Sequence, residues 1–176
     1  IGELTGTDCD WTVTYTYTVE DECGNSSTPQ TYTHTGSDQT LPAGTTTAGS
    51  TANDLCLADV AATYSFDAAA AVMGYTDNSC AGGTLTAVET GTEDITGTDC
   101  AWTVEYTFKV VDNCGNELTA QTYSHTGSDQ TLPAGAATAG STGNDSCLAD
   151  VAATYQFTAA AAVMGYTDNS CAGGTL

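Results

Sequence analysis

Large apolar residues alternate with small polar residues along positions 11–19 of the chain. Threonines separate five apolar residues, which are Trp11, Val13, Tyr15, Tyr17 and Val19. A period of two puts successive side chains on opposite faces of a strand, so this stretch predicts a strand with one buried face. Threonine is well suited to the exposed face of such a strand.

The same alternation returns further along the chain as part of a long internal repeat. Residues 5–85 match residues 96–176 at an offset of 91, with 16 differences in 81 aligned positions. The second strand keeps its apolar face, while Glu105 and Lys109 replace threonines on the other face. A period of 91 residues is too long for a solenoid coil and favours one folding domain per repeat.

Further strands and one helix complete the predicted repeat. Threonine-rich strands are predicted at 30–35, 121–126 and 82–90. A short helix is predicted at 68–73, with Asp67 as its N-cap, Gly74 after its end, and Thr158 as the N-cap of the second copy. Strands outnumber helices, so the predicted fold class is all-β, a β-sandwich with one short helix per repeat.

Strand-breaking residues mark the predicted domain boundaries. Gly, Ser, Asp and Pro are concentrated at 36–44 and again at 127–135. Boundaries there divide the chain into the C-terminal half of a preceding repeat, one complete repeat, and the N-terminal half of a following repeat, at 1–40, 41–131 and 132–176. An alternative boundary near residue 91 would make the sequence Gly-Thr-Glu-Asp the linker.

Charge excludes several classes of partner. The chain has one Lys or Arg residue against 22 acidic residues, a formal net charge of −21. Nucleic acids and anionic lipids are bound through Lys and Arg, so neither is an expected partner. No apolar run is long enough to predict insertion into a membrane.

Eight cysteines point to an oxidising compartment outside the cytoplasm. Zinc binding is the competing interpretation, but the chain has no pair of cysteines spaced as zinc ligands, and both histidines lie far from any cysteine. Disulfides are therefore predicted, and with them an extracellular, secreted or cell-surface location.

The strand at 102–111 limits how the cysteines of the complete repeat can pair. Cys100 and Cys114 flank this strand, which spans about 30 Å, whereas a disulfide requires Cα atoms within roughly 7 Å. A hairpin of 83–90 with 102–111 would place Cys80 beside Cys114. The predicted bonds are therefore Cys80–Cys114 and Cys56–Cys100.

The remaining four cysteines lie in the predicted half-repeats. Cys9 and Cys23 are expected to pair with cysteines of the preceding repeat or subunit. Cys147 and Cys171 are expected to pair with those of the following one. Adjacent copies of the same repeat, in an array or filament, are thus the predicted partners.

Two motifs carry a resemblance to a known family. The run from Tyr75 to Cys80 (YTDNSC) and the run at 102–116 (WTVEYTFKVVDNCGN) resemble HYR (hyalin repeat) domains, and most of all the HYR-like repeats of giant cell-surface adhesins in Bacteroidota. The resemblance covers nearly all of the 91-residue period. It implies an immunoglobulin-like β-sandwich that serves as a spacer or adhesive module in a secreted surface protein.

Calcium is the candidate cofactor, although none is required by the sequence. Calcium takes several oxygen ligands from loops, and acidic and amide residues cluster at predicted strand ends: Asp8, Asp21, Glu22, Asp77, Asn78, Asp99, Asp112, Asn113, Asp168 and Asn169. The alternative is ordinary turn chemistry, because Asp and Asn side chains also hydrogen-bond their own backbone in turns. No EF-hand loop is present.

Three other motifs have simpler interpretations. His34, Ser37 and Asp38 are the residue types of a catalytic triad, but a triad needs residues that converge from different elements. The threonine rows are those of an ice-binding face, yet Lys109 interrupts the row of the second copy. The glycosylation sequon at Asn25 is absent from that copy.

The predicted function follows from the repeat and the cysteines together. The chain is interpreted as a disulfide-stapled structural module of an extracellular fibre or surface adhesin, and not as an enzyme. The alternative is an adhesion module that binds a glycan, a surface or ice through calcium.

Overall fold

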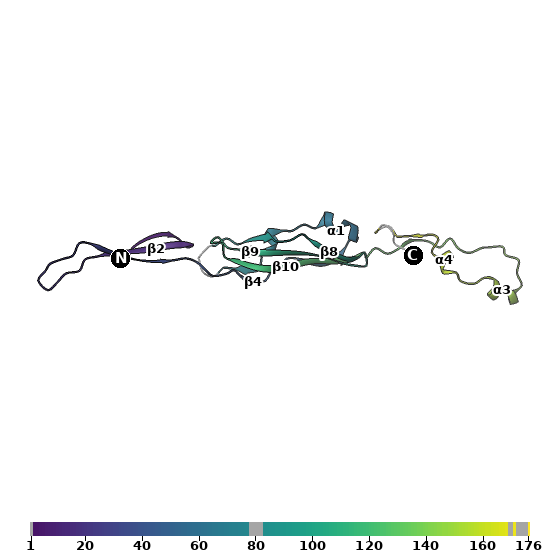
Figure 1. The fold of residues 1–176 in the computed structure, drawn as a ribbon. Coiled ribbons are helices and arrows are strands. Elements are labelled where there is room, and N and C mark those ends of the chain that lie inside the picture. The colour runs from purple at the N-terminus through teal and green to yellow at the C-terminus, as the bar shows by residue number, and fades with distance from the viewer. Residues whose placement is uncertain (1, 78–82, 169–170, 172–175) are drawn as a thin grey trace. The chain divides into compact units, whose positions relative to one another are not determined.

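The computed structural model describes residues 2–77, 83–168, 171 and 176. It consists mostly of strands in several sheets, with a few short helices (Figure 1), so the all-β class is confirmed. The strands are β1 Glu3–Thr7, β2 Asp10–Tyr17, β3 Gln30–Gly36, β4 Ala43–Gly44, β5 Ser50–Asp54, β6 Tyr75–Thr76, β7 Thr86–Glu89, β8 Asp94–Thr98, β9 Ala101–Val111, β10 Glu117–Ser128, β11 Ala134–Gly135 and β12 Tyr166–Thr167.

The largest sheet has the strand order β5-β10-β9-β7, with β8 also paired to β9, and Figure 1 shows β9 beside β10. The alternation predicted for residues 102–110 is confirmed on β9. The five apolar residues predicted to face the core are all buried, namely Trp102, Val104, Tyr106, Phe108 and Val110, while the residues between them are exposed or half-buried.

The chain forms two compact units, each assembled from segments that are distant in sequence. Unit 1 contains residues 1–49, 66–94 and 105–124, and unit 2 contains residues 50–65, 95–104 and 125–176.

Unit 1 is built on antiparallel pairing and an aromatic core. β2 pairs with both β1 and β3, β4 pairs with β6, and β7 pairs with β9, which confirms the predicted hairpin. The ring of Phe66 packs against Tyr106, Phe108 and Tyr123 at centroid distances of 5.8–6.2 Å. Burying rings of this size contributes much of a small domain's stability.

Unit 2 is built around Trp102. The indole N–H of Trp102 donates to the Leu55 carbonyl at 2.7 Å, which satisfies the one polar atom of a buried ring. A β-carbon at Gly127 would overlap the Trp102 ring, so glycine is required there. β5 runs parallel to β10, β11 pairs with β12, and the ring of Tyr64 stacks on His125 at 4.3 Å.

The helices correct one prediction, because each repeat has two short helices in place of one. They are α1 Leu57–Thr63 and α2 Ala68–Ala71, with copies α3 Leu148–Thr154 and α4 Ala159–Ala162. The Asp67 N-cap is confirmed, since its carboxylate accepts from the amides of Ala69 and Ala70. Thr158 occupies the N-cap position of α4, but its side chain makes no capping hydrogen bond. The missed helix α1 has good helix formers and an acidic first turn, but it starts at a cysteine without a side-chain cap.

Candidate functional site: two disulfide junctions

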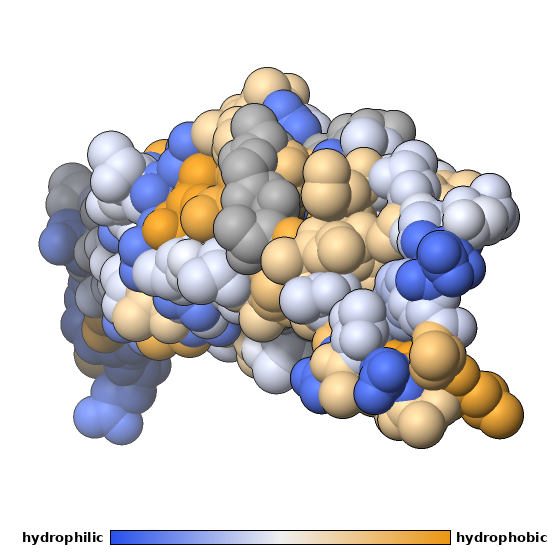
Figure 2. All heavy atoms as spheres, turned by 90° about the vertical axis from the view of Figure 1, so that its right-hand side faces the viewer, coloured by the Kyte–Doolittle hydropathy of each residue, from blue (hydrophilic) through white to orange (hydrophobic). Residues whose placement is uncertain are grey.

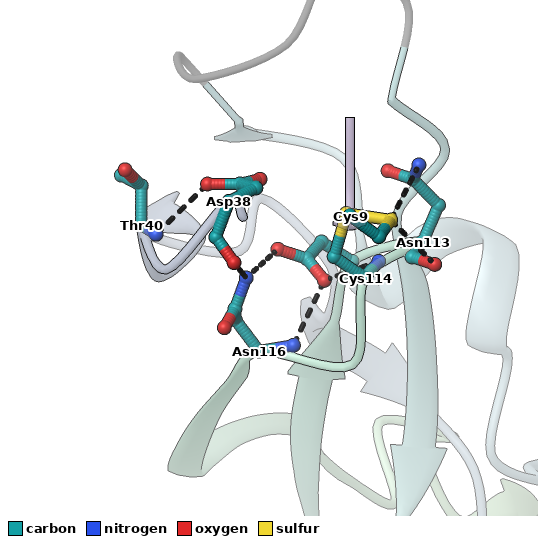
Figure 3. The surroundings of a disulfide bond; sticks show 7 residues. Cys9, Asp38, Thr40, Asn113, Cys114 and Asn116 are labelled. Carbon is teal, nitrogen blue, oxygen red and sulfur yellow. Dashed lines mark hydrogen bonds between the residues drawn. A yellow bond between two sulfur atoms is a disulfide. The ribbon is translucent and has the colours of Figure 1, made fainter. Parts of the chain in front are cut away.

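The first junction lies in unit 1, where Cys9 is bonded to Cys114 with 5.0 Å between their Cα atoms (Figure 3). Cys9 sits in the turn between β1 and β2, and Cys114 in the turn between β9 and β10. The Asp112 carboxylate shapes the second turn, because it accepts from the amides of Cys114 and Asn116 at 2.8 Å and from the Asn116 side chain at 2.8 Å. Asp112 therefore fixes where the Cys114 sulfur points.

Asp38 completes this junction from the loop after β3. Its amide donates to the Asp8 carbonyl at 2.9 Å, and its carboxylate accepts from the Thr40 amide at 2.9 Å. Its carbonyl accepts from the Asn116 side chain at 3.3 Å. The loop that follows one repeat is thereby held on the turn that carries the disulfide of the next.

The second junction lies in unit 2, where Cys56 is bonded to Cys171 with 5.3 Å between their Cα atoms. Cys56 is the N-cap residue of α1, and the next amide, that of Leu57, donates to the Asp99 carboxylate at 2.8 Å. The Asp129 amide donates to the Asp99 carbonyl at 2.7 Å, as the matching Asp38 amide does to Asp8. The loop geometry is thus the same in both copies.

Both predicted pairings within the complete repeat were wrong. Cys114 is bonded to Cys9 in place of Cys80, and Cys56 to Cys171 in place of Cys100. The bonded cysteines are 105 and 115 residues apart, more than one 91-residue period, so each bond joins one repeat to the next. The prediction assumed that a repeat closes its own disulfides, which the strand geometry did not require.

The cysteines of the half-repeats also differ from expectation. Cys9 and Cys171 were assigned to neighbours outside the chain, but both bond the complete repeat within it. Cys23, Cys100 and Cys147 are exposed thiols in the part of the chain that the structure describes. Cys80 lies outside that part.

Hydrogen bonds in the turn that carries Cys114 favour the ionised form of the Asp112 carboxyl. Burial alone would raise the pKa of the Asp112 carboxyl, but hydrogen bonds from Asn116 and Cys114 outweigh it and lower the pKa. The same turn occurs in the first copy, where hydrogen bonds from Asn25 lower the pKa of Asp21. Both carboxylates are therefore ionised at neutral pH, as acceptors of several N–H groups should be.

The predicted calcium residues are mostly dispersed. Asp77 and Asp112 lie together with Asp38, with carboxylate oxygens within 4.8 Å of one another. The Asp21 carboxylate accepts backbone amides within its own turn. The Asp99 carboxylate accepts the Leu57 amide at the start of α1. Asp8, Glu22 and Asn113 are exposed, and Asp168 is half-buried. Asn78 and Asn169 lie outside the described residues. A second group, Cys56, Cys171 and Asp99, cannot ligate a metal as thiolates because its cysteines form a disulfide.

The two histidines lie on equivalent strands but differ in exposure. His34 is exposed on β3. Its copy, His125, is half-buried on β10, where Nδ1 lies 2.7 Å from the Ser50 hydroxyl and the ring stacks on Tyr64. Burial lowers the pKa of His125, so the neutral ring is favoured.

Comparison with protein-family models, characterised proteins and solved structures finds no match for this chain. Among the described residues, no helix is long and apolar enough to cross a membrane. The two disulfides indicate an oxidising, non-cytoplasmic location.

Proposed function

We propose that this chain is a structural module of an extracellular fibre or surface adhesin, in which successive repeats are covalently joined by disulfides. The observation that carries the proposal is that both disulfides connect neighbouring repeats. Each bond joins segments of two successive repeats within one compact unit. Such a bond limits how far the chain lengthens when that unit unfolds, which is useful to a stalk under tension.

The overlap of the two disulfide loops strengthens this interpretation. Cys56 lies inside the loop closed by Cys9 and Cys114, and Cys114 lies inside the loop closed by Cys56 and Cys171. In the oxidised chain, the shortest covalent path from Cys9 to Cys171 runs along the 47 residues from Cys9 to Cys56 and then across the Cys56–Cys171 bond. In the reduced chain the path is the full 162 residues. The oxidised protein therefore resists extension by its covalent structure.

Composition and resemblance fit the same proposal. A net charge of −21 keeps long arrays soluble, and the HYR-like motifs are those of secreted surface repeats with an immunoglobulin-like sandwich. We propose that fold for the complete repeat as well. Adjacent copies of the repeat are the proposed partners, and the proposed role requires no catalysis.

Single-molecule pulling on the full chain tests the proposed function. At roughly 3.3–3.6 Å per residue, the segment from Cys9 to Cys171 should extend by about 160 Å when oxidised and about 550 Å when reduced. A matched control is the double variant C9S/C171S, which opens both loops and should extend fully without reductant. Equal extension of oxidised and reduced wild-type protein would refute the covalent stalk.

Calcium-dependent adhesion is the second candidate function, favoured by the proximity of Asp38, Asp77 and Asp112. Three carboxylates supply hard oxygen ligands of the kind that calcium prefers. Calcium chloride should raise the thermal midpoint of the full chain, and the variant Asp77→Asn should reduce this effect. No midpoint shift with calcium, or an equal shift for Asp77→Asn, would contradict a site at this cluster.

A further inference from the structure

The segment 132–176 exposes apolar side chains whose copies in the complete repeat are buried or half-buried. Val151 is 37% exposed and its copy Val60 is 0% exposed. Phe157 is 85% exposed, while its copy Phe66 packs among aromatic rings. In Figure 2, apolar side chains in orange lie open on the surface among hydrophilic ones. Apolar side chains that are buried in one copy and exposed in the other indicate a surface that lacks its packing partner.

The segment 1–40 exposes the opposite half of the same core. Tyr17 on β2 is 44% exposed and Tyr32 on β3 is 50% exposed, whereas their copies Phe108 and Tyr123 are 0% and 5% exposed. The sheet of β1, β2 and β3 therefore has an apolar face that the corresponding strands of the complete repeat keep covered.

Contacts within the complete repeat show which residues pack against each of these two apolar surfaces. There, the ring of Phe66 contacts three aromatic residues on β9 and β10. The copy of Phe66 is Phe157, in the segment 132–176, and the copies of its three partners, in the segment 1–40, are Tyr15, Tyr17 and Tyr32. The two segments thus carry the two sides of one contact. Among the described residues, they contain the copies of every buried apolar residue of the repeat 41–131 except Ala87 on strand β7.

The repeat offset also assigns a partner to two of the exposed thiols. Cys9 has Cys100 as its copy, and Cys114 is the copy of Cys23. The observed bond joins Cys9 to Cys114. The equivalent bond one repeat later would join Cys100 to the equivalent of Cys114 in the following repeat, which is Cys23 of a second copy of the chain. Both thiols are exposed and available for it.

We propose that two copies of this chain join head to tail, with the segment 132–176 of one packed on the segment 1–40 of the other, and with Cys100 of the first bonded to Cys23 of the second. The inference rests on the proposed function, because it extends the same covalent link between repeats to a link between molecules. The product is a composite repeat equivalent to 41–131.

A small-molecule disulfide such as oxidised glutathione serves as the oxidant. The Cys100 thiolate attacks it and releases one reduced glutathione, and the Cys23 thiolate of the second copy then displaces the other. Two protein thiols are oxidised, one glutathione disulfide is reduced to two thiols, and two thiol protons are transferred to the departing glutathione. Docking raises the effective concentration of the two cysteines, which favours this pair over others.

The test oxidises the full chain with glutathione and measures the mass of the products and their disulfide-linked peptides. Species at multiples of 17.8 kDa containing a Cys100–Cys23 peptide are expected. The variant Phe157→Glu places a charge in the apolar contact and should lower the yield of cross-linked species at least about tenfold. The matched control is Met164→Glu, because Met164 and its copy Met73 are both exposed, and its yield should equal that of the wild type.

Three results would overturn the inference. A monomer with Cys23 and Cys100 as thiols, but with both observed disulfides formed, refutes it and leaves the proposed function intact. Multimers that form equally with Phe157→Glu, or that lack the Cys100–Cys23 peptide, also refute the docking. Absence of the Cys9–Cys114 and Cys56–Cys171 bonds overturns the proposed function as well.

Discussion

The complete repeat and its two flanking segments share nearly the same sequence but differ in what they bury. Trp102 on β9 is 2% exposed, and its copy Trp11 on β2 is 36% exposed. Both lie in the same alternating pattern, and both rings lie against a glycine, Gly127 and Gly36. The pattern therefore specifies which face of a strand is apolar, while burial of that face depends on contacts with segments that are distant in sequence.

The largest effect expected from this comparison comes from the disulfide that joins a flanking segment to the complete repeat. In the double variant C9S/C114S a loop of 105 residues is no longer closed, which should cost about 4–5 kcal/mol by loop-closure entropy. Urea unfolding of the monomeric chain measures the loss. The control Cys23→Ser removes an exposed thiol and should stay within about 0.5 kcal/mol of the wild type.

The two tryptophans test the comparison directly. Trp102→Ala removes a buried ring and its hydrogen bond to Leu55, so a loss of about 3–5 kcal/mol is expected. Trp11→Ala should cost less, because its ring is already partly in water. Equal losses in urea unfolding would show that the segment 1–40 buries its strand face as fully as the complete repeat does.

His125 gives a smaller, pH-dependent effect. Burial lowers the pKa of His125 below its usual value of 6.5, so the unfolded chain takes up a proton first as the pH falls. The resulting stabilisation is complete above about pH 6.5 and is lost as the pH falls through the folded pKa. His125→Gln should make the thermal midpoint less dependent on pH over this range, as thermal unfolding at a series of pH values would show.

The smallest effect concerns a salt bridge that the first copy of the repeat lacks. Lys109 contacts Glu117 at 2.6 Å on the surface, and the corresponding residues of the first copy are Thr18 and Ser26. Lys109→Thr should cost about 0.2–1 kcal/mol, and less at high salt, because such pairs are well solvated. A loss that does not change with salt concentration would point to packing of the Lys109 stem instead.

Local features of this protein could be read from its sequence. Apolar residues two apart defined the buried face of β9, and Asp67 marked the start of α2, because side-chain direction and capping depend on neighbouring residues alone. Helix α1 was missed because it begins at a cysteine that accepts no amide, and so lacks the usual signal.

The sequence alone determined the 91-residue period, the apolar face of each strand and the presence of cysteines suited to disulfides. Only the tertiary structure decided that Cys114 pairs with Cys9 and Cys56 with Cys171, and which copy of each apolar residue is covered. The reason is physical. A disulfide and a buried core both depend on which distant segments approach within a few ångströms, and identical local sequences can satisfy that condition in one repeat and not in another.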